Sequence, residues 1–474
     1  MTEYVTLCVL QSFKKRKVYH QGSDLDWTGC RVQSNVFHVS KKRKVGHLNS
    51  DFDVITYRTQ LNDLHTSKKH KIDHLNSDLE SSVPQRWKKQ KVDHPGKNKA
   101  RCAVIGSTVT ASNGNPNSEE NCLLRRGEVL CSKTSKYKVL DFLGHGGFGE
   151  VVKCNKVGTH ETLAIKLLKN NSLFDKDVRN EIRILKYLRR ERADKYSIVK
   201  AYEWFQYGNH ACLVFELLGQ DLFSFLQQKP LPLKHIRPIL QQVTKALLKL
   251  HSLGLIHADI KPENILLVDP VRQPYKVKVA DFGVTCRISK RAKYASYMGT
   301  PEFRAPELLI GLPFCEAVDI WALGCTAAEV LMGCPLYPGV LHYDQIRYIT
   351  DTQGLPEDHL LHKGKNTDKY FKRVNNSWQL KTLKEYKKET GVKPEEHRKY
   401  FFKSLSEVVE VNMPQKLRRN DLLMEQADRS AFADLLKQML TIDAAKRITA
   451  AGILRHSFLN MTHLLQFSRI CTKC

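Results

Sequence analysis

The chain has 474 residues, too many for one ordinary compact domain, and 42% of them are hydrophobic, which is enough to build one large core. Its 76 lysines and arginines exceed its 49 aspartates and glutamates. The resulting net charge of +27 either favours acidic proteins, nucleic acid or anionic surfaces as partners, or serves solubility alone. The scattered cysteines exclude a small disulfide scaffold, and the lack of a long uncharged apolar run excludes a membrane-embedded protein, so we expect reduced thiols and no membrane contact.

Residues 1–135 are predicted to form a disordered, basic N-terminal region. They lack sustained apolar periodicity and hold 23 basic against 13 acidic side chains. A Lys-rich unit recurs in them, beginning at Lys14, Lys41, Lys68 and Lys88. Clustered cations of this kind fit the acidic grooves of nuclear import receptors and contact nucleic-acid phosphates weakly, and a solvated charge run is the alternative. We therefore expect the protein in the nucleus, with the cytoplasm as a second location.

From residue 137 the pattern becomes that of a folded domain. Alternating apolar residues predict strands at 137–143, 151–154 and 163–168, separated by Gly-rich or polar turns. Apolar residues at three- and four-residue spacing predict helices at 176–189, 236–251, 316–332 and 432–440. A strand-rich front and a helix-rich back indicate two lobes.

A glycine-rich segment joins the first two predicted strands. It follows Leu143 and matches the pattern G-x-G-x-x-G-x-V with Gly144, His145, Gly146, Gly147, Phe148, Gly149, Glu150 and Val151. Glycines let backbone amides approach phosphate groups, because no Cβ stands in the way. A dinucleotide-binding fold would need a helix directly after the glycines, whereas 151–154 is predicted to be a strand. The arrangement therefore favours a loop that covers the phosphates of a nucleotide.

A charged residue follows in the third predicted strand. Lys166 stands among apolar residues, where an ammonium without a partner would be costly. Glu181, in the predicted helix 176–189, is the candidate partner, and an exposed surface pair is the alternative.

The strongest motifs lie further along the chain and read His257-Ala258-Asp259-Ile260-Lys261-Pro262-Glu263-Asn264, Asp281-Phe282-Gly283 and Ala305-Pro306-Glu307. Phosphoryl transfer needs a carboxylate that accepts the proton of the substrate hydroxyl, and Asp259 is the candidate. It also needs oxygen ligands for magnesium, for which Asn264 and Asp281 are the candidates. Lys261, two residues after the candidate base, can contact the γ-phosphate.

On these motifs, residues 136–459 resemble the eukaryotic protein kinase superfamily. Further segments resemble the homeodomain-interacting protein kinases, at 257–259, 268–275, 310–317, 343–348 and 461–465. The resemblance implies an α+β bilobal fold with a small antiparallel β lobe that carries one helix, a larger mainly helical lobe, and ATP with Mg²⁺ in the cleft. It also implies a nuclear Ser/Thr kinase that autophosphorylates an activation-loop tyrosine and modifies transcription factors and their cofactors.

The resemblance carries over to individual residues. It assigns ATP binding to residues 143–151, Lys166, Glu181, Glu216 and Leu218. It makes Asp259, Lys261 and Asn264 catalytic, and Asn264 and Asp281 the magnesium ligands. It also implies that Phe215 guards the adenine pocket, that Glu307 pairs with Arg447, and that Asp319 is a buried structural acid.

Three features depart from the resembled family or from kinases in general. Ala258 stands where most kinases have an arginine that binds activation-loop phosphate, and the resembled family shares this alanine. Tyr297 is the candidate autophosphorylation site, and an unmodified packing tyrosine is the alternative. Pro301 replaces the arginine expected four residues later, so it stays open whether the kinase prefers substrates with proline after the target residue. The chain also stops about fifteen residues after the catalytic domain, where larger relatives continue into a regulatory region.

Two further hypotheses compete with an active kinase. A pseudokinase scaffold that binds ATP and nuclear partners would fit the altered activation segment, although Lys166, Asp259 and Asp281 are all present. A nucleic-acid-binding protein would use the Lys-rich repeats, which lack the interleaved aromatic residues that stack on bases. Residues 355–430 are predicted to be an insert in the large lobe, and 460–474 a short tail.

Overall fold

The computed structural model describes residues 124–146, 149–169, 175–208, 210–227, 229–289 and 299–465, and it describes only the backbone of 145, 146, 169 and 175. Several predicted features lie outside the described residues: the Lys-rich repeats, Gly147, Phe148, the candidate phosphosite Tyr297 and the last residues of the tail. Within the described ranges, no helix has the length and apolarity needed to cross a membrane.

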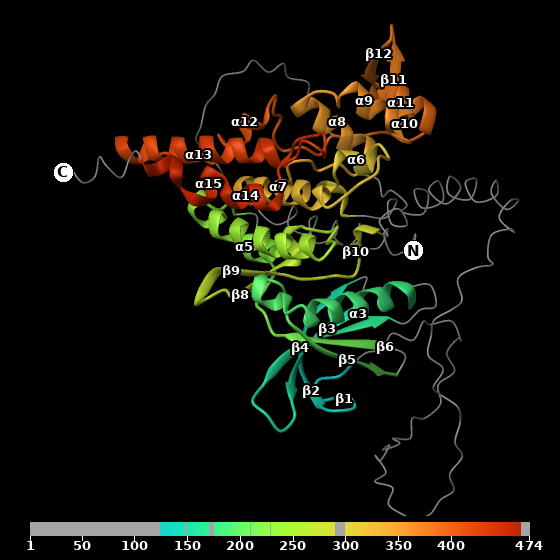
Figure 1. Cartoon of the computed structure of the whole chain (residues 1–474), viewed down its shortest axis with the longest axis vertical. Coiled ribbons are helices and arrows are strands. Elements are labelled where there is room, and N and C mark those ends of the chain that lie inside the picture. Colours follow the sequence, from blue (N-terminus) through green and yellow to red (C-terminus); the bar gives the residue numbers. More distant parts are fainter. Residues whose placement is uncertain are drawn as a thin grey trace, which may run out of the picture. The chain divides into compact units, whose positions relative to one another are not determined.

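The N-terminal lobe is an antiparallel sheet with helix α3 against it (Figure 1). Its six strands lie in the order β1-β2-β3-β4-β6-β5. The elements are β1 (Val129–Cys131), β2 (Lys136–Gly146), β3 (Gly149–Lys156), β4 (Thr162–Lys169), α3 (Asp175–Arg190), η2 (Ala193–Tyr196), β5 (Ala201–Tyr207) and β6 (His210–Glu216). The three strands predicted from alternation are β2, β3 and β4, and each is longer than predicted.

Alternation along β4 divides its side chains between the two faces of the sheet. Leu163, Ile165 and Leu167 are buried in a hydrophobic cluster formed by the sheet strands and by Leu124, which precedes β1. Leu168 lies on the other face, in the cluster that contains the buried residues of α3 and continues into the helical lobe. Lys166 shares this second face, so the strand directs its ammonium toward α3.

The C-terminal lobe is mainly helical, coloured from green to red in Figure 1. Its first elements are α4 (Leu222–Leu226), α5 (Leu233–Ser252), β7 (Leu255–Ile256), η3 (Pro262–Asn264), β8 (Ile265–Asp269), β9 (Gln273–Val279) and β10 (Cys286–Arg287). They are followed by η5 (Pro301–Phe303), α6 (Pro306–Leu309), α7 (Ala317–Met332), α8 (His342–Gln353), α9 (Asp358–Lys363), α10 (Thr367–Tyr370), β11 (Phe371–Val374), β12 (Ser377–Leu380), α11 (Leu383–Thr390), α12 (Leu405–Val408), α13 (Arg419–Met439), α14 (Ala450–Arg455), α15 (Ser457–Asn460) and η6 (Thr462–Leu464).

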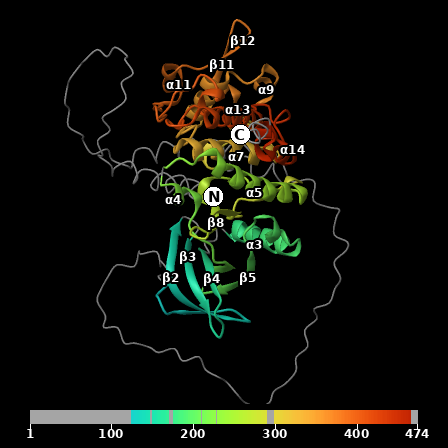
Figure 2. The same ribbon diagram turned by 90° about the vertical axis from the view of Figure 1, so that its left-hand side faces the viewer.

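Helix α7 lies at the centre of this lobe, where α5 and α13 pack against it (Figure 2). Every residue of α7 after Ala317 is buried, as expected for a helix that is apolar on all sides. The helix ends where Gly333 adopts a φ of 77°, a left-handed conformation that glycine takes without steric cost. Together the sheet lobe and the helical lobe confirm the predicted bilobal α+β fold.

Two expected boundaries differ from the observed elements. Strand β1 pairs with β2 through residues 129–131, so the sheet begins before the expected start at residue 136. The expected insert contains α9 to α12 and the hairpin β11–β12, but α13 already begins at Arg419 and runs through residue 430. The start of α13 therefore lies in the expected insert, whereas apolar residues late in α13, such as Phe432 and Leu436, follow residue 430 and pack into the main core.

Candidate active site

Lys166 is the centre of a charged cluster between the two lobes. Its Nζ lies 3.0 Å from Glu181 Oε1 on α3 and 3.0 Å from Asp281 Oδ1 in the segment after β9. Burial alone would lower the pKa of the ammonium, but the charges of Asp281 and Glu181 outweigh burial and raise that pKa above its usual value. Lys166 is therefore a permanent cation, and the predicted Lys166–Glu181 pair is present.

Helix α3 is tied to the segment that follows Asp281 as well as to β4. Asn180, the residue before Glu181, donates through Nδ2 to the carbonyl of Thr285 at 2.8 Å. The apolar face of α3, with Ile184 and Leu188 among its buried residues, packs into the core shared with the helical lobe. The pairing of Glu181 with Lys166 thus depends on α3 packing against both lobes.

Asp259 is held by donors on both of its carboxylate oxygens. Oδ2 lies 2.8 Å from Lys261 Nζ and accepts a hydrogen bond from Asn264 Nδ2 at 3.0 Å. Oδ1 accepts from the backbone N–H of Thr300 at 3.0 Å and from its hydroxyl at 2.8 Å. The Thr300 hydroxyl in turn accepts from Lys261 Nζ at 2.7 Å, which closes a ring of three side chains.

The charge state of Asp259 follows from these donors. Burial would raise the pKa of its carboxyl group, but the Lys261 ammonium and the hydrogen bond from Thr300 outweigh burial and lower that pKa below its usual value. The pKa of Lys261 is raised, because attraction to Asp259 exceeds the effect of burial. At neutral pH the pair is therefore a carboxylate and an ammonium, which leaves the carboxylate able to accept a proton.

The backbone around Asp259 is held in a conformation that non-glycine residues rarely adopt. Ala258 has a φ of 70° and Asp281 a φ of 63°, both in the left-handed region. The fully buried carboxylate of Asp319 on α7 accepts the N–H groups of His257 at 2.9 Å and Ala258 at 2.8 Å. These two bonds fix the turn that presents Asp259, and they give Asp319 the structural role predicted for it.

Asn264 and Asp281, which lie near Asp259, offer oxygen ligands for a divalent cation. Asn264 uses Nδ2 to bind Asp259, so its amide oxygen is the atom that would bind a metal. The Asp281 side chain is 26% exposed, and the Lys166 ammonium and the Gly283 N–H hold its pKa below the usual value even though burial would raise it. One amide oxygen and one ionised carboxylate are ligands that Mg²⁺ prefers, and both residues fit the ion.

The glycine-rich segment is the hairpin between β2 and β3. Gly146 on β2 pairs with Gly149 on β3. Two residues further along β3, Val151 pairs with Lys166 on β4, so the glycines lie close to the lysine in the sheet. A Cβ on Gly149, whose φ is +129°, would lie 1.7 Å from the carbonyl oxygen of Leu167. A Cβ on Gly144 would meet nothing within 4 Å, which leaves open space on that side of the strand.

The comparison with known families decides the identity of this fold. The family model described as the protein kinase domain matches residues 137–459. The chain belongs to the protein kinase family. The chain is 55% identical to homeodomain-interacting protein kinase 2 of Mus musculus over 358 aligned residues, covering 74% of this chain and 30% of that protein.

More distant relatives carry the same name. Homeodomain-interacting protein kinase 1 of Caenorhabditis elegans is 44% identical over 372 residues, covering 75% of this chain and 44% of that protein. Homeodomain-interacting protein kinase 4 of Rattus norvegicus is 43% identical over 351 residues, covering 71% and 57%. The catalytic region is therefore like that of the homeodomain-interacting protein kinases, while the chain spans about 30% of the length of the first curated relatives.

Glu216, the last residue of β6, makes carboxylate contacts that the sequence did not indicate. Its carboxylate binds Lys278 Nζ at 2.6 and 2.8 Å and accepts the Lys200 N–H at 2.6 Å. A contact of Glu216 with a nucleotide would thus come from its backbone. Leu218 and Phe215 are partly buried and pack against the core of the helical lobe.

Two residues of the kinase site, Thr300 and Arg304, were not predicted from the sequence. Thr300 contacts both Asp259 and Lys261, although only its neighbour Pro301 stood out in the sequence. Arg304 is 6% exposed, and its Nη2 donates to the Gly299 carbonyl at 2.7 Å. A hydroxyl residue directly before a proline of the activation segment is the signal that could have drawn attention to Thr300. The predicted Glu307–Arg447 pair is confirmed, with contacts of 2.7 and 2.9 Å.

Proposed function

We propose that the chain is an active protein kinase that transfers the γ-phosphate of ATP to serine and threonine hydroxyls of proteins. The observation that carries the proposal is the ring of Asp259, Lys261 and Thr300, which keeps an ionised carboxylate beside a cation in a buried site. The Lys166–Glu181 pair supports it, because that pair positions a cation for the phosphates of ATP.

Each residue of the site has a role in the proposed transfer. Asp259 accepts the proton of the substrate hydroxyl while the new oxygen–phosphorus bond forms and the bond to the β-phosphate oxygen breaks. Lys261 neutralises charge on the transferred group, and Lys166 holds the non-transferred phosphates. Asn264 and Asp281 would hold Mg²⁺, which neutralises charge that develops on the phosphate oxygens.

Substrates and location follow from the relatives and the sequence. The relatives are named for their interaction with homeodomain proteins, so we infer that transcription factors and their cofactors are substrates. The Lys-rich repeats of the N-terminal region would bind nuclear import receptors and, weakly, nucleic acid. Tyr297 is the proposed site of tyrosine autophosphorylation. In this organisation, residues 136–459 are the catalytic domain, and the Lys-rich N-terminal region serves nuclear targeting.

The test is a transfer assay with purified full-length protein, labelled ATP, Mg²⁺ and a generic basic protein substrate. Asp259→Asn removes the base, and we expect it to lower the rate by about 10²- to 10⁴-fold. Asp421→Asn, the same change at an exposed position of α13, is the matched control and should leave transfer intact. Mass spectrometry of the products shows which hydroxyls, Tyr297 included, receive phosphate. Binding of ATP without transfer by the parent protein would instead support the scaffold hypothesis.

A further inference from the structure

Three segments of the kinase domain are joined at Glu216, the last residue of β6. Its carboxylate lies 2.6 and 2.8 Å from Lys278 Nζ on β9 and accepts the Lys200 N–H at 2.6 Å. The Glu216 N–H donates to the Lys200 carbonyl at 3.0 Å, so the side chain and the backbone of this residue are both held. Because the N–H is used in this way, a contact of Glu216 with a nucleotide is left to its carbonyl oxygen.

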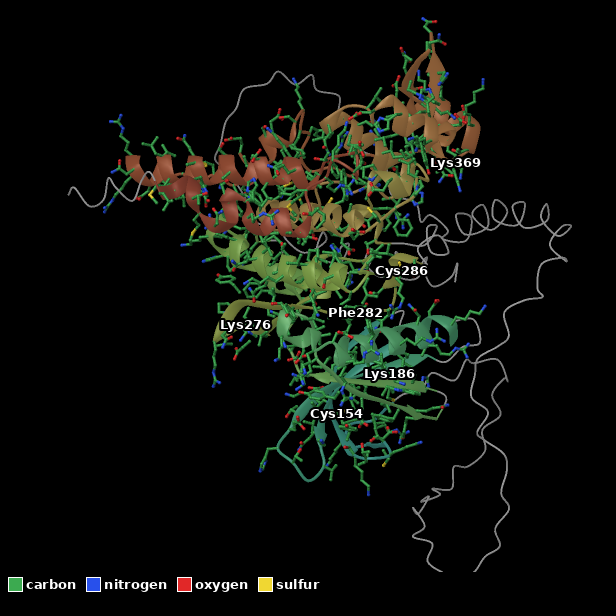
Figure 3. All side chains as sticks on the ribbon, in the orientation of Figure 1. Cys154, Lys186, Lys276, Phe282, Cys286 and Lys369 are labelled. Carbon is green, nitrogen blue, oxygen red and sulfur yellow. The ribbon has the colours of Figure 1, made fainter. Side chains whose placement is uncertain are left out.

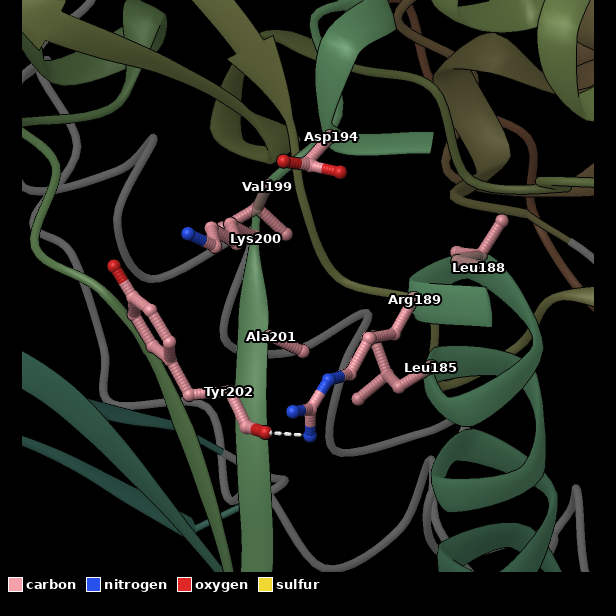
Figure 4. A pocket seen from close by; sticks show the side chains of 8 residues that line it. All are labelled: Leu185, Leu188, Arg189, Asp194, Val199, Lys200, Ala201 and Tyr202. Carbon is pink, nitrogen blue, oxygen red and sulfur yellow. Dashed lines mark hydrogen bonds between the residues drawn. The ribbon is translucent and has the colours of Figure 1, made fainter. Parts of the chain in front are cut away.

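The residue after Lys278 on β9, Val279, is bonded to the same stretch of chain. Its N–H donates to the Ser197 carbonyl at 2.8 Å, and its carbonyl accepts the Val199 N–H at 2.9 Å. Ile198 is fully buried, and Val199 lines the pocket drawn in Figure 4, where the chain enters β5. Residues 197–200 are therefore a fixed support for the end of β6 and for β9.

Strand β9 leads from this support to the other end of the cleft. Asp281, the proposed magnesium ligand, follows Lys278 by three residues, and Lys278 itself pairs with Leu266 on β8. Asp281 Oδ1 lies 3.0 Å from Lys166 Nζ, whose strand β4 is the neighbour of β6 in the sheet. A series of contacts thus connects Glu216, where the resemblance places adenine, with the residues at the phosphate end.

The Glu216–Lys278 pair is largely shielded from water. The Lys278 side chain is 17% exposed and that of Glu216 is 20% exposed, so solvent and salt screen this pair less than a surface pair. Both carboxylate oxygens contact the one ammonium, and Oε1 also accepts the Lys200 N–H. These contacts hold the carboxylate in one orientation and join the end of β6 firmly to β9.

We propose that Glu216 and Lys278 are a positioning pair that fixes the distance between the adenine end of the cleft and Asp281. ATP spans this distance, since its adenine ring and its phosphates bind at opposite ends of the cleft. A protein that already holds both ends at the required spacing does not have to order them when ATP binds, so the pair raises the affinity for ATP. This role rests on the proposed kinase function, because it takes ATP as the ligand.

Calorimetric titration of the full chain tests the role with two ligands of different length. A non-hydrolysable ATP analogue with Mg²⁺ reaches both ends of the cleft, whereas adenosine reaches only the adenine end. Lys278→Met should weaken binding of the ATP analogue by about tenfold and binding of adenosine by less than about threefold. Lys276→Met, the same change at an exposed position of β9, is the matched control and should alter neither affinity (Figure 3).

A second variant removes the charge of the other member of the pair. Glu216→Gln keeps the size of the side chain and should weaken binding of the ATP analogue by about fivefold or more. The double variant Glu216→Gln/Lys278→Met should match Lys278→Met, because the two single changes remove the same interaction. In the transfer assay, Lys278→Met should raise the KM for ATP by about tenfold and leave kcat within about threefold, since saturating ATP brings both ends to the same spacing.

Several results would overturn the positioning role: unchanged affinity of Lys278→Met for the ATP analogue, equal weakening of the analogue and adenosine, or additive losses in the double variant. A lower melting temperature without a difference between the two ligands would reduce the pair to a packing contact. Binding of neither ligand by the parent protein would refute the kinase function and the positioning role together. The expected binding pattern without any phosphate transfer would refute the kinase function alone.

Discussion

The Thr300 hydroxyl provides a sharp test of how the base is held. Thr300→Val keeps the shape of the side chain and the backbone N–H bond to Asp259, but removes the hydroxyl that lies 2.8 Å from Asp259 Oδ1 and 2.7 Å from Lys261 Nζ. A hydrogen bond to a charged group contributes about 1.5–3 kcal/mol. We therefore expect kcat to fall by roughly ten- to a hundredfold, with a much smaller change in the KM for ATP.

The same substitution changes the pH dependence of kcat. The Thr300 hydrogen bond is one of the interactions that lower the pKa of Asp259, so its removal raises that pKa. Because the base must be ionised to accept a proton, the acid limb of the kcat profile should move to higher pH. Steady-state kinetics across the acid range measure both effects.

Two controls separate this role from general damage. Thr300→Ser restores the hydroxyl and should recover most of the rate. Thr326→Val removes a buried hydroxyl from α7, where it bonds only to the preceding helical turn at Ala322, and should leave kcat unchanged. A Thr300→Val enzyme within about twofold of the parent, or one that serine does not rescue, would show that the hydroxyl does not support the base, since the expected loss is at least about 1.5 kcal/mol.

Two further predictions concern the phosphate-binding side of the site. Glu181→Gln should lower kcat/KM by about tenfold or more in the transfer assay, because it removes the negative charge that orients Lys166. An unchanged kcat/KM would exclude this role of Glu181. Gly149→Ala should lower the melting temperature and ATP affinity together, because its Cβ would collide with the Leu167 carbonyl. Gly144→Ala, whose Cβ meets open space, should keep the melting temperature and change ATP affinity alone; equal destabilisation of both variants would contradict this distinction.

The sequence predicted the fold, and it indicated which residues meet in the candidate active site, because these depend on local pattern. Alternation in β4 fixes which face Lys166 occupies, and the spacing of Asp259 and Asn264 brings them together within one loop and a short helical turn. The Glu307–Arg447 pair was inferred from the family resemblance rather than from the pattern, and the structure contains it.

The features that were missed depend on contacts between distant segments. Thr300 reaches Asp259 across 41 positions of sequence, and the Thr-Pro pair does not indicate which side chains its hydroxyl contacts. The resemblance names Glu216 as an ATP-binding residue without saying which of its atoms takes part, and the contact of its carboxylate with Lys278 is made by a distant strand, β9.

The pair of Glu307 and Arg447 permits a stability prediction that separates a buried ion pair from a surface one. Both side chains are at most 2% exposed, and the guanidinium also donates to the carbonyls of Ala317, Thr441 and Ile442. Glu307→Gln leaves this buried cation without its counter-charge, so we expect the free energy of unfolding to fall by about 3 kcal/mol in urea denaturation.

Replacing both members of the pair gives the decisive comparison. In Glu307→Gln/Arg447→Met no buried cation remains, so the double variant should lose clearly less stability than the sum of Glu307→Gln and Arg447→Met measured singly. Glu161→Gln, which removes an exposed partner 3.6 Å from Lys156, should change stability by less than about 1 kcal/mol. The pair does not hold the end of the activation segment against the C-terminal helices if Glu307→Gln lowers the free energy of unfolding no more than Glu161→Gln does. The same conclusion follows if the stability losses of Glu307→Gln and Arg447→Met simply add in the double variant.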